Sequence, residues 1–171
     1  MKEDPAEEVS SFVLERLEGL LDVPVEFARA ARGSAVVEIG ALALLAQTLA
    51  REASSEAFAR AYVAYERADR LAGRAAGAAP VLEPALVSER AEIVLVETLA
   101  AVGPRIEAAV LARDFGAALE TAAELGPAVD RFFDEVLVMA EDARVRANRL
   151  RLLLDVRDAV GALGDLSQIP R

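Results

Sequence analysis

The chain of 171 residues contains no histidine and no cysteine, and its only lysine is Lys2. These absences exclude imidazole bases, thiol nucleophiles, zinc sites built on histidine or cysteine, iron–sulfur clusters and disulfides. Serine and threonine hydroxyls have no histidine or internal lysine to activate them, so nucleophilic catalysis lacks a base. We therefore expect this chain, taken alone, to be non-catalytic and to bind no metal or cofactor.

Positive charge is also scarce. The sequence holds 19 arginine and lysine residues against 29 aspartate and glutamate residues, which gives a formal net charge of -10 at pH 7. A free-standing nucleic-acid module with a broad basic face is therefore not the expected class, and DNA is not an expected partner.

No apolar run is long enough to indicate a membrane span. The best candidate, residues 35–50, carries Glu38 and falls short of the roughly 20 apolar residues that a span needs. Residues 1–8 are acidic and do not resemble a secretory or organelle signal. Since cysteine is absent as well, we expect a cytoplasmic protein with no membrane partner.

Apolar residues recur at positions i, i+3, i+4 and i+7 along most of this alanine- and leucine-rich chain, a pattern that predicts an all-α fold. Capping residues, glycines and prolines divide the chain into a helical bundle of about 8 to 9 helices. The expected helices cover about 5–21, 24–33, 34–52, 55–73, 88–102 and 104–112, two more begin near 114 and 127, and the last covers 143–162.

Glycine and proline mark the main interruptions. Gly103-Pro104 is expected to break or kink the chain between the fifth and sixth helices. The stretch 74–84, rich in glycine, alanine and proline, is the clearest loop. Neither half of the chain is clearly large enough for its own core, so we expect one domain over 1–171. The eighth helix is expected to point these residues inward: Val129, Phe132, Phe133, Val136 and Leu137.

The last predicted helix departs from the acidic background. Residues 143–157 carry five arginines and a single acidic residue, Asp155. On a helical wheel the arginines form two strips with apolar flanks between them, so the helix is expected to pack between neighbours and to expose only part of the set. At least one arginine is therefore expected to be structural, paired with a carboxylate such as Asp134 or Asp165.

A weaker basic strip lies on the fourth predicted helix. Its arginines outnumber its acids, and Tyr62 and Tyr65 lie among them. Proteins use aromatic rings among arginines to stack and clamp unpaired RNA bases, because every base offers a π-face. Ordinary helix packing explains the same pattern, so both interpretations stay open. The strip consists of Arg60, Arg67, Arg70 and Arg74.

The C-terminal third carries the strongest resemblance to a known family. Its motifs are FFDEVLVMAED at 132–142, RANRL at 146–150 and DLS at 165–167. In order and spacing these motifs resemble the C-terminal, DALR-like anticodon-binding domain of bacterial glycyl-tRNA synthetase beta subunits. Upstream, the opening helix, the helix over 61–71 and the stretch 104–133 resemble the same domain more loosely.

The resemblance implies that the chain is an excised C-terminal domain of a longer beta subunit of glycine-tRNA ligase. Its expected partners are tRNA-Gly, the alpha subunit and the rest of the beta subunit. ATP and Mg²⁺ are expected in the alpha subunit, and none in this chain. Because the net charge of the chain opposes every phosphate contact, we expect weak RNA binding that the rest of the synthetase reinforces.

The resemblance also suggests roles for individual residues. Phe133 and Met139 are expected in the core, while Asp134, Asp142 and Asp165 are expected to cap helices or pair with arginines. Arg149 fits either a structural role or an RNA contact. The expected tRNA-binding set is Arg144, Arg146, Asn148, Arg149 and Arg151 of the last helix, with Tyr62, Tyr65, Arg67 and Arg70 of the fourth.

A rival hypothesis from a different class is a helical protein–protein interaction module. Such a module would assemble the synthetase subunits without touching RNA. The acidic first helix and the apolar flanks of the last helix are the features that favour it.

Overall fold

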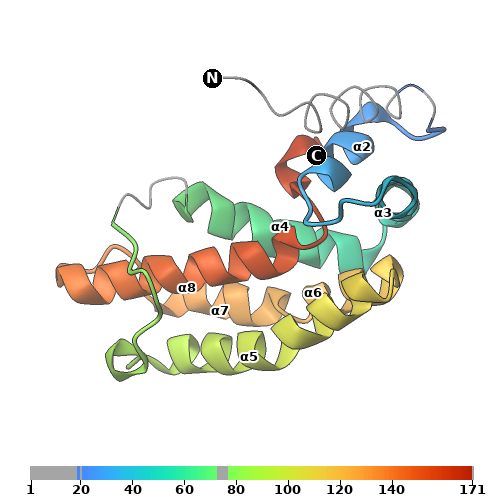
Figure 1. Ribbon diagram of the computed structural model, residues 1–171. Coiled ribbons are helices and arrows are strands. Elements are labelled where there is room, and N and C mark those ends of the chain that lie inside the picture. Colours follow the sequence, from blue (N-terminus) through green and yellow to red (C-terminus); the bar gives the residue numbers. More distant parts are fainter. Residues whose placement is uncertain (1–18, 20, 73–76, 171) are drawn as a thin grey trace, which may run out of the picture.

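The computed structural model describes residues 19, 21–72 and 77–170. These residues form seven α-helices and two short 3₁₀ helices and contain no β-strand, so the all-α prediction is confirmed. The elements are α2 (Val25–Arg32), α3 (Ile39–Glu52), α4 (Glu56–Ala72), η1 (Pro84–Leu86), α5 (Arg90–Leu111), α6 (Phe115–Ala123), α7 (Gly126–Glu135), α8 (Ala143–Gly161) and η2 (Leu166–Gln168) (Figure 1).

The predicted count of about 8 to 9 helices is not matched. The first predicted helix, over 5–21, lies outside the described residues apart from its last positions. Of the two outcomes predicted at Gly103-Pro104, a break or a kink, the break is wrong, because α5 continues through Pro104. Ala100, four residues earlier, and Pro104 are both exposed, so the carbonyl left without an amide partner faces solvent.

Other boundaries follow the sequence closely. Helix α2 lies between Pro24 and Gly33, α6 and α7 are separate helices, and α8 covers the predicted range within one residue. Helix α3 begins at Ile39 rather than after Ser34, whose hydroxyl accepts a bond from the nearby Val36 amide instead. The predicted loop over 74–84 falls partly outside the described residues, and 77–83 contain no helix.

The centre of the molecule is the packing of α4 against α8, which run in opposite directions (Figure 1). Helix α4 contributes Ala61, Ala64 and Ala68, all completely buried, at three- and four-residue spacing. These small side chains let the backbones of the two helices approach closely. Helices α5, α6 and α7 complete one contiguous apolar core.

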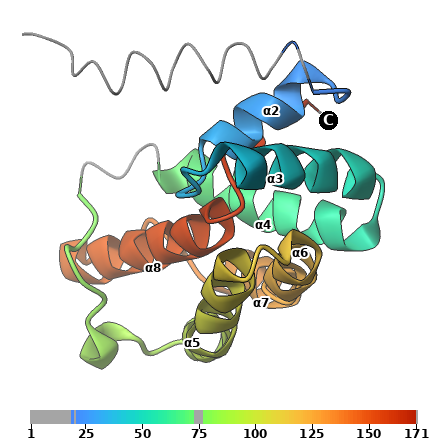
Figure 2. The same cartoon turned by 45° about the vertical axis from the view of Figure 1, so that its right-hand side comes forward.

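The C-terminal segment ties α2 to α4, close to the C-terminus marked in Figure 2. The amide of Asp165 donates to the carbonyl of Ala30 at 2.9 Å, and the Tyr65 hydroxyl donates to the carboxylate of Asp165 at 3.0 Å. Gly164 has a φ of 117°, and a Cβ there would lie 2.2 Å from the Ala30 carbonyl oxygen. Only glycine therefore fits this close approach.

Among the described helices, none combines the length and the apolar character that crossing a membrane requires.

Candidate nucleic-acid interface

The predicted arginine-rich helix begins at one end of the bundle, where three segments converge. We call this the loop end; it consists of segment 77–83, loop 136–142 and the first turns of α8, and it lies away from α2 and α3 (Figure 1). Segment 77–83 runs along α8, since the amide of Ala79 donates to the carbonyl of Ala147 at 3.0 Å. Two buried polar residues of α8, Asn148 and Arg149, hold segment 77–83 and loop 136–142 in place.

Asp142 starts α8. Its carboxylate accepts bonds from the amides of Arg144 and Val145 at 2.8 and 3.1 Å, which confirms the predicted cap. The bonds from the Val145 and Arg144 amides hold the pKa of Asp142 below its usual value. Asp165 caps η2 in the same way, by accepting from the amide of Ser167. The third predicted acid, Asp134, is exposed and forms no ion pair within the described ranges.

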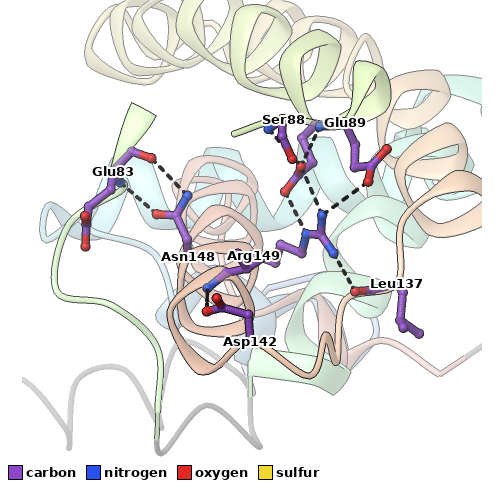
Figure 3. A network of polar contacts seen from close by, with 9 residues as sticks. Glu83, Ser88, Glu89, Leu137, Asp142, Asn148 and Arg149 are labelled. Carbon is purple, nitrogen blue, oxygen red and sulfur yellow. Dashed lines mark hydrogen bonds and ion pairs between the residues drawn. The ribbon is translucent and has the colours of Figure 1, made fainter. Parts of the chain in front are cut away.

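Asn148 fastens segment 77–83 to α8. Its side chain is only 1% exposed. The amide oxygen accepts from the Glu83 backbone N–H at 2.7 Å, and the amide nitrogen donates to the Glu83 carbonyl at 3.1 Å (Figure 3). Both polar ends of the asparagine are thus satisfied by one residue of the neighbouring segment, which fixes the path of that segment.

Arg149 forms a buried ion pair with Glu92 of α5. Its Nε lies 2.8 Å from Oε1 of Glu92 and its Nη2 lies 3.2 Å from Oε2, while Nη1 donates to the Leu137 carbonyl at 2.8 Å (Figure 3). The same carboxylate accepts from the amides of Ser88 and Glu89. One guanidinium therefore joins the first turn of α5, helix α8 and loop 136–142.

The electrostatics of this pair favour the charged state. Burial alone would raise the pKa of Glu92, but the hydrogen bonds from Arg149 and from the Glu89 and Ser88 amides outweigh burial and hold the pKa below its usual value. The side chains of Arg149 and Glu92 are only 7% and 1% exposed, so neither charge is screened by much water.

A structural arginine was predicted, but its proposed partners were wrong, because Arg149 binds Glu92 and not Asp134 or Asp165. The sequence carried a signal that pointed to Glu92. This acid lies on the same helical face as Leu95 and Ile106, both completely buried. An acid within a buried apolar stripe requires a cationic or hydrogen-bonding partner from another element.

The other predicted residues of α8 lie closer to solvent. The side chain of Arg144 is 73% exposed and lies 2.8 Å from the Glu83 carboxylate. Arg146 donates to the carbonyls of Ala140 and Glu141 at 2.7 and 3.3 Å and has no carboxylate partner in the part of the chain that the structure describes. Arg151 is 21% exposed and pairs with two acids of its own helix, Asp155 and Asp158.

The predicted residues of α4 have other partners. Arg67 lies 2.7 Å from Asp130 and places its guanidinium 5.1 Å from the centre of the Phe133 ring, and Arg70 pairs with Glu66. Tyr65 is 7% exposed and binds Asp165, while the half-buried Tyr62 donates to the carbonyl of Ile169 at 3.2 Å. Both tyrosine hydroxyls thus serve the docking of the C-terminal segment.

Loop 136–142 corrects two predictions about the core. Leu137 is 70% exposed and Met139 is 55% exposed, whereas Val136 and Val138 are buried. Helix α7 ends at Glu135, Val136 has extended backbone angles, and residues 138–139 form a turn. The helical spacing on which the prediction relied no longer applies there.

In the described ranges, no group of three or more acidic side chains is arranged to hold a metal ion.

Comparison with known proteins identifies the fold as that of an anticodon-binding module. The chain matches the model of the DALR anticodon binding domain over residues 55–168 and belongs to that family.

Its relatives include three proteins named glycine–tRNA ligase beta subunit. The one from Desulforudis audaxviator is 45% identical over 67% of this chain, the one from Solidesulfovibrio magneticus is 36% identical over 82%, and the one from Dechloromonas aromatica is 33% identical over 96%. The matched regions cover 16%, 21% and 20% of these relatives, so the chain spans about a fifth of their length.

Proposed function

We propose that this chain serves as the anticodon-binding domain of a glycine–tRNA ligase beta subunit and that it contacts the anticodon stem-loop of tRNA-Gly with its loop end. The observation that carries the proposal is the family match over 55–168, together with the exposed Arg144 and the half-buried Arg146 at the start of α8. The motifs that resemble beta subunits, at 132–142, 146–150 and 165–167, include loop 136–142 and the first turns of α8.

Arg146 is the arginine best suited to a phosphate. It forms no ion pair in the described part of the chain, although the Asp142 carboxylate is close enough to interact with it electrostatically, and two backbone carbonyls hold its guanidinium in place. A guanidinium with donors to spare binds phosphate with directed hydrogen bonds. Positioned donors also lose less side-chain entropy when RNA binds.

Arg144 and Arg151 are proposed as secondary contacts. Arg144 pairs with Glu83 on the surface, and an exposed pair of this kind contributes only about 0.2–1 kcal/mol, so exchange of Glu83 for a phosphate is inexpensive. Arg151 is less exposed and has two acidic partners, which weakens its attraction for RNA. Asn148 and Arg149 are buried, so in this proposal they hold the interface from inside.

The net charge of -10 limits what the domain achieves alone. Repulsion of phosphates makes the intrinsic affinity low and dependent on salt. In a longer chain, a second RNA contact would hold the anticodon near the loop end at high effective concentration. We infer that the domain contributes selectivity for the loop while the rest of the synthetase contributes affinity.

The remaining expectations follow from the same proposal. The rest of the beta subunit and the alpha subunit are the proposed protein partners, and the cytoplasm is the proposed location. ATP and Mg²⁺ would bind the alpha subunit, with no cofactor in this chain.

A binding titration of the 171-residue chain tests the proposal. A labelled glycine anticodon stem-loop and a control with a scrambled loop are titrated by fluorescence anisotropy, at low and at physiological salt. Preference for the glycine loop at low salt is the expected result. Equal binding to both RNAs, or binding to neither, would contradict anticodon readout by this chain and favour the rival role in subunit assembly.

A further inference from the structure

Two arginines of α8 hold loop 136–142 by its backbone. Arg149 donates to the carbonyl of Leu137, near the start of the loop, and Arg146 donates to the carbonyl of Ala140, near its end. Among the described residues, no other side chain donates to a backbone carbonyl of this loop. The position of one arginine therefore depends on a segment that the other arginine helps to fix.

The direction of Arg149 is set in turn by α5. Glu92 binds the guanidinium through both carboxylate oxygens, at 2.8 and 3.2 Å, and leaves Nη1 for the carbonyl of Leu137 (Figure 3). The carboxylate is itself fixed, because it also accepts from the amides of Ser88 and Glu89. Since a guanidinium is a rigid planar fork, a carboxylate that binds one edge determines where the remaining donors point.

We propose that Glu92 is a positioning residue for RNA binding, which acts through Arg149 and loop 136–142 on the guanidinium of Arg146. This inference rests on the proposed function and extends it to a side chain of α5 that is only 1% exposed and does not itself touch RNA. A donor that is already held in place loses less entropy when its ligand binds. When Arg149 releases Leu137, the segment that holds Arg146 loses its other support, and this advantage is reduced.

A buried ion pair that acts only on stability makes a different prediction. In that case a change at Glu92 alters RNA binding only through the folded fraction, and its effect is the same with or without Arg146. A positioning role instead requires that the effect disappear once Arg146 is removed. A double-mutant cycle separates the two cases, because it measures what two residues contribute jointly.

The test titrates the glycine anticodon stem-loop by fluorescence anisotropy at low salt, with variants made in the unmodified chain and in Arg146→Ala. Glu92→Gln keeps an oxygen for the amides of Ser88 and Glu89 but removes the charge that directs Arg149. The double variant E92Q/R149M removes both charges, so that neither is left buried without its partner. It decides the question if Glu92→Gln alone does not fold.

Leu119→Ala is the matched control for lost stability. Leu119 is 1% exposed in α6, which takes no part in the loop end (Figure 1), and its truncation leaves a cavity in the core. A thermal melt of each variant establishes that it is folded at the temperature of the titration.

The two variants at Glu92 should each weaken RNA binding by about three- to fivefold. The loss should not exceed that of Arg146→Ala, about fivefold, because both variants act through that arginine. In the Arg146→Ala background the same changes should alter the affinity by less than about twofold, which is the range of independent residues. Leu119→Ala should leave the affinity of the folded protein unchanged in both backgrounds.

The outcomes separate this inference from the proposed function. If the folded variants at Glu92 bind RNA as tightly as the unmodified chain, or lose the same factor in both backgrounds, the positioning role is wrong and the proposed function stands. If the unmodified chain binds neither the glycine stem-loop nor its scrambled control, both proposals are wrong.

Discussion

Arg146 has a position fixed by two backbone carbonyls and forms no ion pair within the described residues, and this makes its contribution to RNA binding measurable. We expect Arg146→Ala to weaken binding of the glycine anticodon stem-loop by about fivefold, which corresponds to roughly 1 kcal/mol for one charge-assisted contact in water. Loss of one phosphate contact should also reduce the slope of log K against log salt by about 0.7. Both values come from anisotropy titrations over a range of salt concentrations.

Arg105→Ala is the matched control for this prediction. Arg105 is exposed, pairs with Glu124 and lies at the α5–α6 contact rather than at the loop end. Its removal lowers the net charge by the same amount and should leave RNA affinity close to that of the unmodified chain. Equal losses of affinity in the two variants would mean that RNA binding depends only on the total charge of the chain.

The buried pair of Arg149 and Glu92 gives a prediction about stability. Arg149→Met leaves the Glu92 carboxylate buried without a cation, and we expect the free energy of unfolding to fall by about 3–5 kcal/mol. Urea unfolding measures the loss. Arg144→Met, which removes only an exposed pair, should change stability by less than about 1 kcal/mol. A similar small loss for Arg149→Met would show that water reaches the carboxylate.

Because the pKa of Glu92 is lowered in the folded state, the free energy of unfolding depends on pH. A carboxyl group whose pKa is lower in the folded state stabilises the fold above its unfolded pKa, about 4.3, and this stabilisation disappears as pH falls through the folded pKa. Stability should therefore decrease as the solution is acidified below about pH 4. In urea unfolding between pH 2.5 and 6 (roughly the span of the titration), Glu92→Gln should give a shallower decrease, and an unchanged profile would contradict this account.

At the level of single elements, helix α5 keeps a proline in its interior. Pro104 provides no amide for the carbonyl of Ala100, and it lies on the solvent side of the helix. We expect Pro104→Ala to raise the free energy of unfolding by about 1 kcal/mol, since alanine restores the hydrogen bond while the unfolded chain gains some freedom. Pro127→Ala, in the first turn of α7, is the control and should give no gain.

The boundaries of helices were predictable from the sequence where neighbouring residues alone determine them. Gly126-Pro127 separates α6 from α7 and Asp142 starts α8, and both signals depend only on neighbouring residues. The continuity of α5 was not predictable in this way, because it depends on which side of the helix faces solvent. The path of loop 136–142 also required the buried Arg149, which holds it from another element.

The sequence predicted where the candidate site lies better than it predicted which residues form the site. An excess of arginine in 143–157 pointed to α8, but Arg149 is buried beside Asn148, Arg146 is half-buried and Arg144 is exposed. A helical wheel gives the angle of each side chain, whereas burial depends on which neighbour covers that angle. Leu137 and Met139 were assigned to the core because apolar character was taken to mean burial.

For the molecule as a whole, the acidic charge and the few exposed arginines of the loop end predict how binding depends on salt. With phosphate contacts from three residues at most, Arg144, Arg146 and Arg151, the slope of log K against log salt should be about -2 for a single-stranded loop. Titrations of the unmodified chain with the glycine stem-loop at several salt concentrations give this slope. A slope of about -5 or steeper would require more phosphate contacts than the loop end provides. The RNA would then have to contact another face of the molecule as well.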